Sequence, residues 1–267
     1  MLTNIIVCGA AGRMGKLLVS LVHDHPDTHL VGAVEASGHT AIGKDAGEVA
    51  GIGTVGVQIT DDYGAIAAPD NVTLDFTMAE AAIEHLRVAA ARQAALVIGT
   101  TGFSASQRVE AEQLASKTRT LIAPNMSVGV NVLLKAVADV ARILQDDFDP
   151  EIVEIHHRFK VDAPSGTALA LGRAIAAAQG KDFEQQATLA RQGITGQRPD
   201  EQIGIMALRG GDVVGDHTVV FAGFGERLEL THRAQSRECL ARGALRAALW
   251  LPHQPLGLYS MKEVLGL

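Results

Sequence analysis

The sequence of 267 residues has few of the features that mark secreted, membrane-bound or disulfide-rich proteins. It contains only two cysteines, Cys8 and Cys239, and two cysteines so far apart form neither a disulfide framework nor a metal motif. The first apolar run has no Lys or Arg before it and is soon broken by glycines, so it resembles neither a signal peptide nor a membrane span. We therefore expect a cytoplasmic protein with no membrane partner.

The sequence also lacks a basic stripe, a long linker, a low-complexity tract and an internal repeat. Its net charge is -7, and binding to nucleic acid normally requires clustered positive charge, so we expect no nucleic-acid partner. What it does have is 47% hydrophobic residues, enough for a sizeable core in one large domain or two modest ones.

Short β-rich runs alternate with helical patterns in the first half of the chain. Strands are predicted over residues 4–10, 29–35, 72–77, 95–101 and 120–125, with helices over 15–24, 80–93 and 106–117. Continuous apolar strands that alternate with helices indicate a parallel sheet covered on both faces. The predicted fold class is α/β, with a Rossmann-like doubly wound parallel sheet.

The pattern changes after residue 125. A long amphipathic helix is predicted over 128–144, and strands over 151–159, 203–209, 216–221 and 226–232 are interrupted by one helix after Ser165. This pattern predicts an inserted α+β domain with a mixed, largely antiparallel sheet. A last helix over 236–251 is expected to return to the first domain. The expected division is a dinucleotide-binding domain at 1–127, completed by 237–267, and a substrate-binding and oligomerisation domain at 128–236.

The segment "GAAGRMG" follows the first predicted strand and opens the first predicted helix. In that context Gly9 allows a tight turn, Gly12 allows the backbone to approach a pyrophosphate, and Gly15 allows the helix to pack closely on the strand. The spacing departs from G-x-G-x-x-G, because Ala11 and Met14 occupy the second and third glycine positions. A glycine-rich turn without a ligand is the alternative.

Acidic and small residues at later strand ends extend this prediction of a nucleotide site. Glu35 ends the second predicted strand, where an acid is expected to accept hydrogen bonds from the adenine ribose. The segments "GTTG" at 99–102 and "APN" at 123–125 end later strands, and ligands of open α/β sheets bind at that edge. The segment "HDHPDTH" at 23–29 suggests a metal site, but a solvated helix end explains it better, and we expect no metal.

The stretch "EIHHRFKVDAPSGTAL" at 154–169 gathers several titratable groups before a helix. His156 and Lys160 would lie about 13 Å apart in an extended strand, so a joint site requires the chain to leave the strand near His156. Ser165 or Asp162 could cap the helix, whose free N–H groups together with Lys160 suit a carboxylate or phosphate. A neighbouring histidine can donate a proton near neutral pH. The residues alone also allow a charged edge strand followed by a capped helix.

This stretch resembles the signature of the bacterial 4-hydroxy-tetrahydrodipicolinate reductase family. The segments "GAAGRMG", "DFT", "IGTTGF", "NMSVGVN" and "GERLELTHRA" are similar to that family's segments and occur in its order. The resemblance implies hydride transfer from NADH or NADPH to a cyclic dicarboxylate imine, with loss of water, in the diaminopimelate and lysine pathway. It also implies a homo-oligomer, expected to be a tetramer, assembled through the sheet of the inserted domain.

The resemblance assigns roles to particular positions of this chain. It implies that His156 and Lys160 are catalytic proton donors, and that His157, Gly166 and Thr167 bind substrate, with Ser165 in the same turn. The implied cofactor contacts are Gly9, Ala10, Ala11, Gly12, Arg13, Met14, Glu35, Gly99, Thr100, Thr101, Ala123, Pro124, Asn125 and Met126.

Two other functions remain open from the residues alone. One is a different Rossmann oxidoreductase with an inserted domain, acting on an amino or imino acid such as aspartate. The other is a nicotinamide-sensing regulator, which would leave His156 and Lys160 unexplained. For the cofactor, Glu35 favours NADH, whereas Arg13, His39 and Lys44 could accommodate the 2′-phosphate of NADPH. We expect use of both cofactors, with NADH preferred.

Overall fold

The structure, a computed structural model, describes residues 2–267, which divide into two compact units. Unit 1 runs to Val128 and also includes Glu238–Leu267, and unit 2 is Gly129–Arg237. Each unit contains its own β-sheet. Within residues 2–267, no helix has the length and apolar character that crossing a membrane requires.

Unit 1 is built on a seven-stranded sheet in the order β12-β6-β5-β4-β1-β2-β3, and every pairing in it is parallel. Successive side chains of β1 enter opposite cores: Ile5 and Val7 face one, and Ile6 and Cys8 face the other. The predicted parallel sheet with two covered faces is therefore confirmed. Its strands are β1 Thr3–Cys8, β2 Thr28–Val34, β3 Ile59–Thr60, β4 Asn71–Asp75, β5 Ala95–Ile98, β6 Arg119–Ile122 and β12 Gly257–Tyr259.

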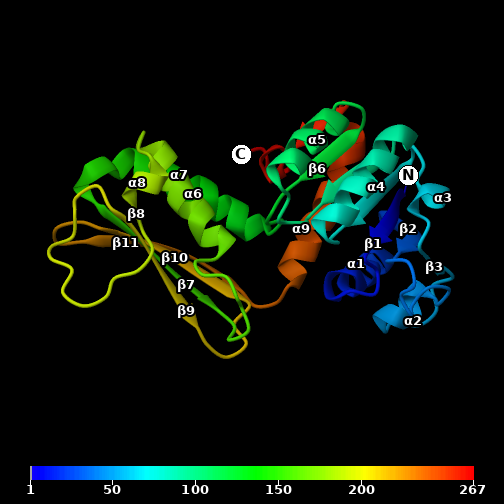
Figure 1. Ribbon diagram of the computed structural model, residues 1–267, viewed down its shortest axis with the longest axis horizontal. Helices are drawn as coiled ribbons and strands as arrows, with labels where there is room; N and C mark the ends of the chain where they lie inside the picture. Colours follow the sequence, from blue (N-terminus) through cyan, green and yellow to red (C-terminus); the bar gives the residue numbers. More distant parts are fainter. Residues whose placement is uncertain (1) are drawn as a thin grey trace. The chain divides into compact units, whose positions relative to one another are not determined.

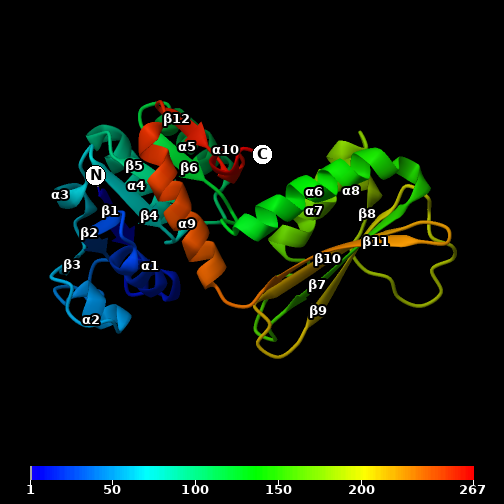
Figure 2. The same ribbon diagram turned by 180° about the vertical axis from the view of Figure 1, so that it is seen from behind.

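Helices cover both faces of this sheet (Figure 1). Those that bury apolar side chains in the first core are α1 Arg13–Asp24, α2 Ala46–Ala50, α9 Glu238–Trp250 and α10 Met261–Leu265. Those that contribute to the second are α3 Tyr63–Ile66, α4 Ala79–Arg92 and α5 Ala105–Ala115. The helix near the C-terminus, α9, packs against α1, β4 and β5, so the end of the chain completes this unit (Figure 2).

Unit 2 contains a five-stranded mixed sheet in the order β11-β10-β7-β9-β8. β10 is antiparallel to both β7 and β11, whereas β9 is parallel to β7 and β8. The helices α6 and α7 lie along one face of this sheet in both views (Figures 1 and 2). The elements of unit 2 are α6 Val128–Leu144, β7 Asp149–His156, α7 Gly166–Ala178, α8 Phe183–Gln186, β8 Ala187–Thr188, β9 Ile203–Arg209, β10 Gly215–Ala222 and β11 Arg227–Ala234. A short 3-10 turn at Gln145–Asp147 follows α6, and another, at Leu251–His253, follows α9 in unit 1.

Strict alternation along β7 and β10 sorts the side chains of unit 2. Ile152, Val219 and Phe221 enter the core under α6 and α7 and are fully buried. The intervening side chains, such as Val153 and Val220, point to the opposite face, where they are only half-buried.

Five predicted strands extend two or three residues too far, and one of them is β1, which ends at Cys8 rather than at residue 10. β4, β5 and β6 end at Asp75, Ile98 and Ile122, and β7 ends at His156 rather than at residue 159. One cause is visible after β4, where the N–H of Thr77 donates to the Asp75 side chain (2.8 Å) instead of to a neighbouring strand. The residues beyond these ends form loops at the carboxyl edges of the sheets, where the candidate site residues lie.

Candidate active site

The glycine loop between β1 and α1 has the close packing that its glycines predict. Gly9 adopts a left-handed φ of 72°, and the N–H of Gly12 donates to the carbonyl of Gly9 at 2.9 Å. A Cβ on Gly15 would lie 2.0 Å from the Gly9 carbonyl oxygen, so no other residue fits there without moving the helix from the strand. The turn therefore presents the backbone directly at the start of α1.

The N-terminus of α1 has no side-chain cap among the described residues. Gly12 precedes the helix in an extended conformation and is exposed, as is Arg13 in the first turn. Uncapped N–H groups and the positive end of the helix dipole suit a phosphate. The loop therefore fits the pyrophosphate of a dinucleotide, which is the group that the sequence predicts here.

Glu35 follows β2 and its carboxylate lies against the glycine loop. Its Oε2 accepts from the N–H of Ala11 at 2.9 Å, and its Oε1 accepts from the N–H of Ala36 at 3.0 Å. A carboxylate oxygen can accept a second hydrogen bond, so both oxygens retain capacity for ribose hydroxyls. The backbone contacts fix the carboxylate in the place that the sequence predicts for the ribose-binding acid.

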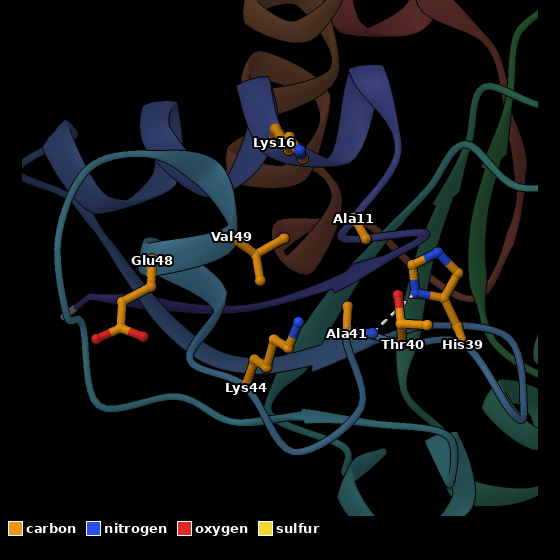
Figure 3. A pocket seen from close by; sticks show the side chains of 8 residues that line it. All are labelled: Ala11, Lys16, His39, Thr40, Ala41, Lys44, Glu48 and Val49. Carbon is orange, nitrogen blue, oxygen red and sulfur yellow. Dashed lines mark hydrogen bonds between the residues drawn. The ribbon is translucent and has the colours of Figure 1, made fainter.

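A pocket of about 410 Å³ opens beside the glycine loop (Figure 3). Lys16 enters it from α1, and Lys44 enters it from the loop before α2. His39 also lines it, and its Nδ1 accepts from the N–H of Ala41 at 3.1 Å. The sequence pointed to His39 and Lys44 but missed Lys16, whereas Arg13 is not among the residues that line this pocket.

A second pocket, of about 470 Å³, lies where the loops after β4 and β5 meet and is lined by Thr77, Gly99, Thr100 and Thr101. Thr77 connects the loops, because its carbonyl accepts from the Thr100 hydroxyl at 2.9 Å and its methyl group lies near Gly9. Its own N–H and hydroxyl donate to the buried carboxylate of Asp75, at 2.8 and 2.6 Å. The structure therefore brings the predicted segment 99–101 into one pocket wall.

The predicted segment 123–126 follows β6 but lines neither pocket. The side chains of Ala123 and Met126 are buried in the core, and that of Ala10 in the glycine loop is buried as well, so only their backbone could contact a ligand. The Asn125 side chain accepts from the N–H of Ser127 at 2.9 Å, which shapes this loop, and Pro124 is exposed.

One group of possible metal ligands occurs among the described residues: Cys8, Asp75 and His85, whose ligand atoms lie within 4.8 Å of one another. His85 Nδ1 and Asp75 Oδ2 already form a hydrogen bond of 2.6 Å. Burial, and then the Asp75 charge, raise the pKa of the Cys8 thiol well above its ordinary value. Because a thiol binds metal as the thiolate, this cluster favours a hydrogen-bonded pair over an ion. The segment 23–29 contributes no member.

In unit 2, the stretch of titratable groups at 154–169 leaves the sheet at His156. The carbonyl of His156 still accepts from Gly210, but the N–H of Lys160 donates to the His157 carbonyl at 3.1 Å in a turn. The chain therefore leaves the strand at His156, which is the condition that a joint site of His156 and Lys160 requires.

The His156 ring is nearly buried and is held by a neighbour on the same strand. Its Nδ1 lies 2.6 Å from Oε2 of Glu154, which is fully buried. Arg209, at the end of β9, donates to both oxygens of Glu154 at 2.9 Å. Burial alone would raise the pKa of Glu154, but the hydrogen bonds from Arg209, His156 and the Ser165 backbone lower it below its ordinary value.

A second histidine, His217 on β10, stands beside the first. The two rings meet edge to face with centroids 5.1 Å apart, and His217 Nε2 lies 3.0 Å from the Ser165 hydroxyl oxygen. Burial, and then the charge of His156, lower the pKa of His217 to about 4. His217 is therefore neutral near pH 7.

Lys160 and His157 lie in the turn after β7. Lys160 donates to Asp162 Oδ1 at 2.7 Å, and this hydrogen bond lowers the pKa of Asp162. The Lys160 side chain is only 20% exposed. The Nδ1 of His157 is buried and has no hydrogen-bond partner among residues 2–267.

Ser165 caps α7 through its hydroxyl, which accepts from the N–H of Ala168 at 3.2 Å. Of the two caps that the sequence allows, the structure therefore selects Ser165. The next residue, Gly166, is exposed, and a Cβ there would meet no atom within 4 Å. Gly166 and the half-buried Thr167 form an open helix N-terminus that suits a carboxylate.

Sequence reasoning missed Glu154, Arg209 and His217 as site residues. Glu154 lies two residues before His156, so alternation along a strand could have placed it on the same face. Arg209 is in register with His156, and His217 with Glu154, across different strands. No signal in one sequence gives that register.

Comparisons with known proteins identify the family of this chain. The family model of the dihydrodipicolinate reductase N-terminus matches residues 3–126, and the model of the C-terminus matches residues 129–265. The chain belongs to the dihydrodipicolinate reductase family. The family identifies it as an oxidoreductase, and its N-terminal unit as a nucleotide-binding domain of the kind that holds NAD(P)H.

Individual relatives match along nearly their whole length. A 4-hydroxy-tetrahydrodipicolinate reductase of Syntrophobacter fumaroxidans is 51% identical over 261 residues, which cover 98% of both chains. One of Anaeromyxobacter dehalogenans is 52% identical over 266 residues, or 100% of this chain and 98% of that one. A dipicolinate-bound dihydrodipicolinate reductase from Paenisporosarcina sp. TG-14 superposes with a TM-score of 0.74 at 23% identity, covering 98% and 99% of the two chains, and supports the fold.

Proposed function

We propose that this protein reduces the cyclic imine 4-hydroxy-tetrahydrodipicolinate to tetrahydrodipicolinate in the diaminopimelate and lysine pathway. The observation that carries the proposal is identity of about half the residues along the whole chain to reductases of that name. In the balanced reaction, the substrate takes a hydride from NADH or NADPH and a proton, and it loses its hydroxyl group as water. Unit 1 is the dinucleotide-binding domain, and unit 2 is the substrate-binding and oligomerisation domain.

The glycine loop and the two pockets of unit 1 hold the nicotinamide cofactor. Backbone groups from Gly9 to Met14 contact the pyrophosphate, and Glu35 accepts from the adenine ribose. The loop at Gly99–Thr101 and the backbone at Ala123–Met126 contact the nicotinamide half. When bound, the cofactor supplies the hydride.

The turn and helix of unit 2 bind the two carboxylates of the imine. Gly166 and Thr167 offer backbone N–H groups at the start of α7, and Lys160 adds a positive charge. His157 contacts the substrate, and Ser165 holds the first turn of the helix in place. A dicarboxylate is the guest that this combination suits best.

Addition of a hydride to a conjugated imine leaves negative charge that a proton must neutralise. His156 and Lys160 are the groups that supply protons here. The Glu154 carboxylate receives a hydrogen bond from Nδ1 of His156, which leaves Nε2 as the atom that exchanges a proton with the substrate. Lys160 exchanges its hydrogen bond to Asp162 for one to the substrate.

Both cofactors are accepted, with NADH preferred. Glu35 favours a free ribose hydroxyl over a phosphate, because the two negative charges repel. Lys16 and Lys44, which line the neighbouring pocket, offset that repulsion in part. Neither is a guanidinium that could bind a phosphate with two parallel hydrogen bonds.

The protein works in the cytoplasm as a homo-oligomer, most simply a tetramer. Within unit 2, α6 and α7 cover one face of the sheet, and the other face carries half-exposed apolar side chains. A second copy of this chain is the partner that would cover it.

A spectroscopic assay tests the proposal. The protein is mixed with NADH and the freshly made imine product of the preceding pathway enzyme, and nicotinamide absorbance is followed. Rapid oxidation that requires the imine is the expected result. Oxidation only with another amino or imino acid such as aspartate would reassign the substrate, and cofactor binding without turnover on any of them would indicate a nicotinamide sensor.

A further inference from the structure

We infer that Glu154 is a positioning residue that fixes both the ring of His156 and the first turn of α7. The inference deepens the proposed function, since it rests on the roles given to His156 and to the helix N-terminus. Glu154 itself is fully buried and acts through its neighbours.

All the accepting capacity of the Glu154 carboxylate is used. Its Oε2 accepts from His156 and from Arg209, at 2.6 and 2.9 Å. Its Oε1 accepts from the backbone N–H of Ser165 and from Arg209, both at 2.9 Å. Two oxygens with two hydrogen bonds each leave no freedom to rotate, so the carboxylate is a fixed reference for three other groups.

This arrangement determines the tautomer of His156. An ionised carboxylate can only accept, so the proton of the neutral ring must reside on Nδ1 and the lone pair on Nε2. A Cβ at Gly215 would lie only 2.9 Å from Nε2. Glycine at that position therefore keeps a side chain away from Nε2, the atom proposed to exchange the proton.

The same carboxylate reaches the anion site. Ser165 precedes Gly166 and Thr167, and its N–H is held by Glu154 while its hydroxyl caps α7. Arg209 adds a hydrogen bond to the carbonyl of Asp162, at 2.7 Å, and so ties down the loop that carries Lys160. The ion pair between buried Glu154 and partly buried Arg209 therefore sets the proposed proton donor and the carboxylate-binding turn relative to each other.

A carboxylate on the same strand provides a matched control. Glu151 is on the opposite face of β7 and is paired with Arg191 and Arg198, both within 2.9 Å. Its hydrogen bonds among the described residues go to Arg191 and Arg198, and it lies outside the proposed site. If breaking any carboxylate–arginine cluster on β7 were enough to lower kcat, then Glu154→Gln and Glu151→Gln should both lower it.

The test compares Glu154→Gln with Glu151→Gln. A glutamine side chain has one acceptor atom, so Nδ1 of His156 loses its fixed acceptor. We expect kcat to fall by about 10- to 100-fold, as is common for residues that orient a functional histidine, while KM for NADH is unchanged. Glu151→Gln should keep kcat within about twofold, as expected for a change away from the reacting groups. An unchanged kcat in Glu154→Gln would overturn the inference.

The tautomer is measured directly in the unmodified protein by ¹⁵N NMR of labelled histidine, with His156→Asn used to assign the signals. A protonated Nδ1 and an unprotonated Nε2 support the inference even where Glu154→Gln fails to fold, and the opposite tautomer refutes it. Full activity of His156→Asn would instead remove the proposed role of His156. A failure of the inference about Glu154 is therefore distinguishable from a failure of the role proposed for His156.

Discussion

His156 and Lys160 are four residues apart in sequence, and each is held by a carboxylate of its own. Glu154 is buried and fixes the histidine, whereas Asp162 is exposed and can release the lysine. At the scale of single residues, the proposed site therefore combines one rigidly held histidine and one adaptable lysine. The residue types suggested a proton-donating histidine and a cationic lysine, and the family resemblance implied that both donate protons, but neither predicted this difference between them.

Replacement of either donor by alanine should lower kcat by about 10²- to 10⁴-fold, the usual effect of losing general acid catalysis. The affinity for NADH should stay nearly unchanged, since both residues lie in unit 2. Lys160→Ala should also raise KM for the imine. Steady-state kinetics together with NADH binding by fluorescence check this, and near-normal kcat in both variants would remove their assigned role.

His217 should make the stability of the protein depend on pH. Its pKa is lowered to about 4 in the folded protein, so the unfolded chain binds the proton more readily. Stability is therefore fully present above about pH 6.5 and falls as the pH drops toward 4, by up to about 3 kcal/mol from this group. Glu154, His156, His232 and Lys160 share its electrostatic environment.

Urea unfolding at pH 7.5 and pH 4.5 measures this effect. His217→Gln should show a smaller loss of unfolding free energy between the two pH values than the unmodified protein. His253→Gln, at an exposed position in unit 1, should keep the original loss. Equal pH dependence in all three proteins would show that His217 is not the source.

The proposed preference for NADH rests on a few charges around Glu35. Ala36→Arg should raise kcat/KM for NADPH by about tenfold, because one charge-assisted hydrogen bond contributes roughly 1.5 kcal/mol or more. Lys44→Ala and Lys16→Ala should harm NADPH more than NADH, because both side chains line the pocket beside Glu35. The measurements are kcat/KM and dissociation constants for both cofactors. A clear NADPH preference in the unmodified protein would show that the basic residues outweigh Glu35.

At the scale of elements, the long periodic segments were predictable and the short ones were not. The helix over 128–144 and the strand over 203–209 were predicted with the bounds that the structure gives. β12 and β3 have only three and two residues, so no periodicity reveals them. Register between strands is equally invisible in one sequence, which is why Arg209 and His217 were missed while the contiguous cluster around His156 was found.

The loops at the end of β4 and β5 depend on Asp75, which was not among the predicted site residues. Asp75→Ala removes the acceptor for both Thr77 donors and for His85, so the wall of the second pocket loses its anchor. We expect the dissociation constant for NADH to rise by about tenfold or more, as for other supporting residues of a site.

Asp70→Ala is the matched control, because Asp70 is exposed and precedes the same strand. Isothermal titration with NADH compares the two variants, and thermal unfolding separates loss of binding from loss of the fold. If Asp75→Ala remained folded and bound NADH normally, the loop would not depend on this carboxylate.

At the scale of the whole molecule, the open face of the unit 2 sheet determines the expected assembly. Side chains such as Val153, Met206 and Val220 alternate with those of the core and therefore point away from α6 and α7. Contiguous apolar side chains on a surface commonly mark a site of association. A symmetric tetramer should therefore have four times the mass of one chain in light scattering at micromolar concentration.

Met206→Glu places a charge on the open face and should shift the mass toward smaller species, whereas Ile143→Glu, on an exposed position of α6, should not. A monomeric unmodified protein would contradict the assembly, and a tetramer unaffected by Met206→Glu would place its interface elsewhere.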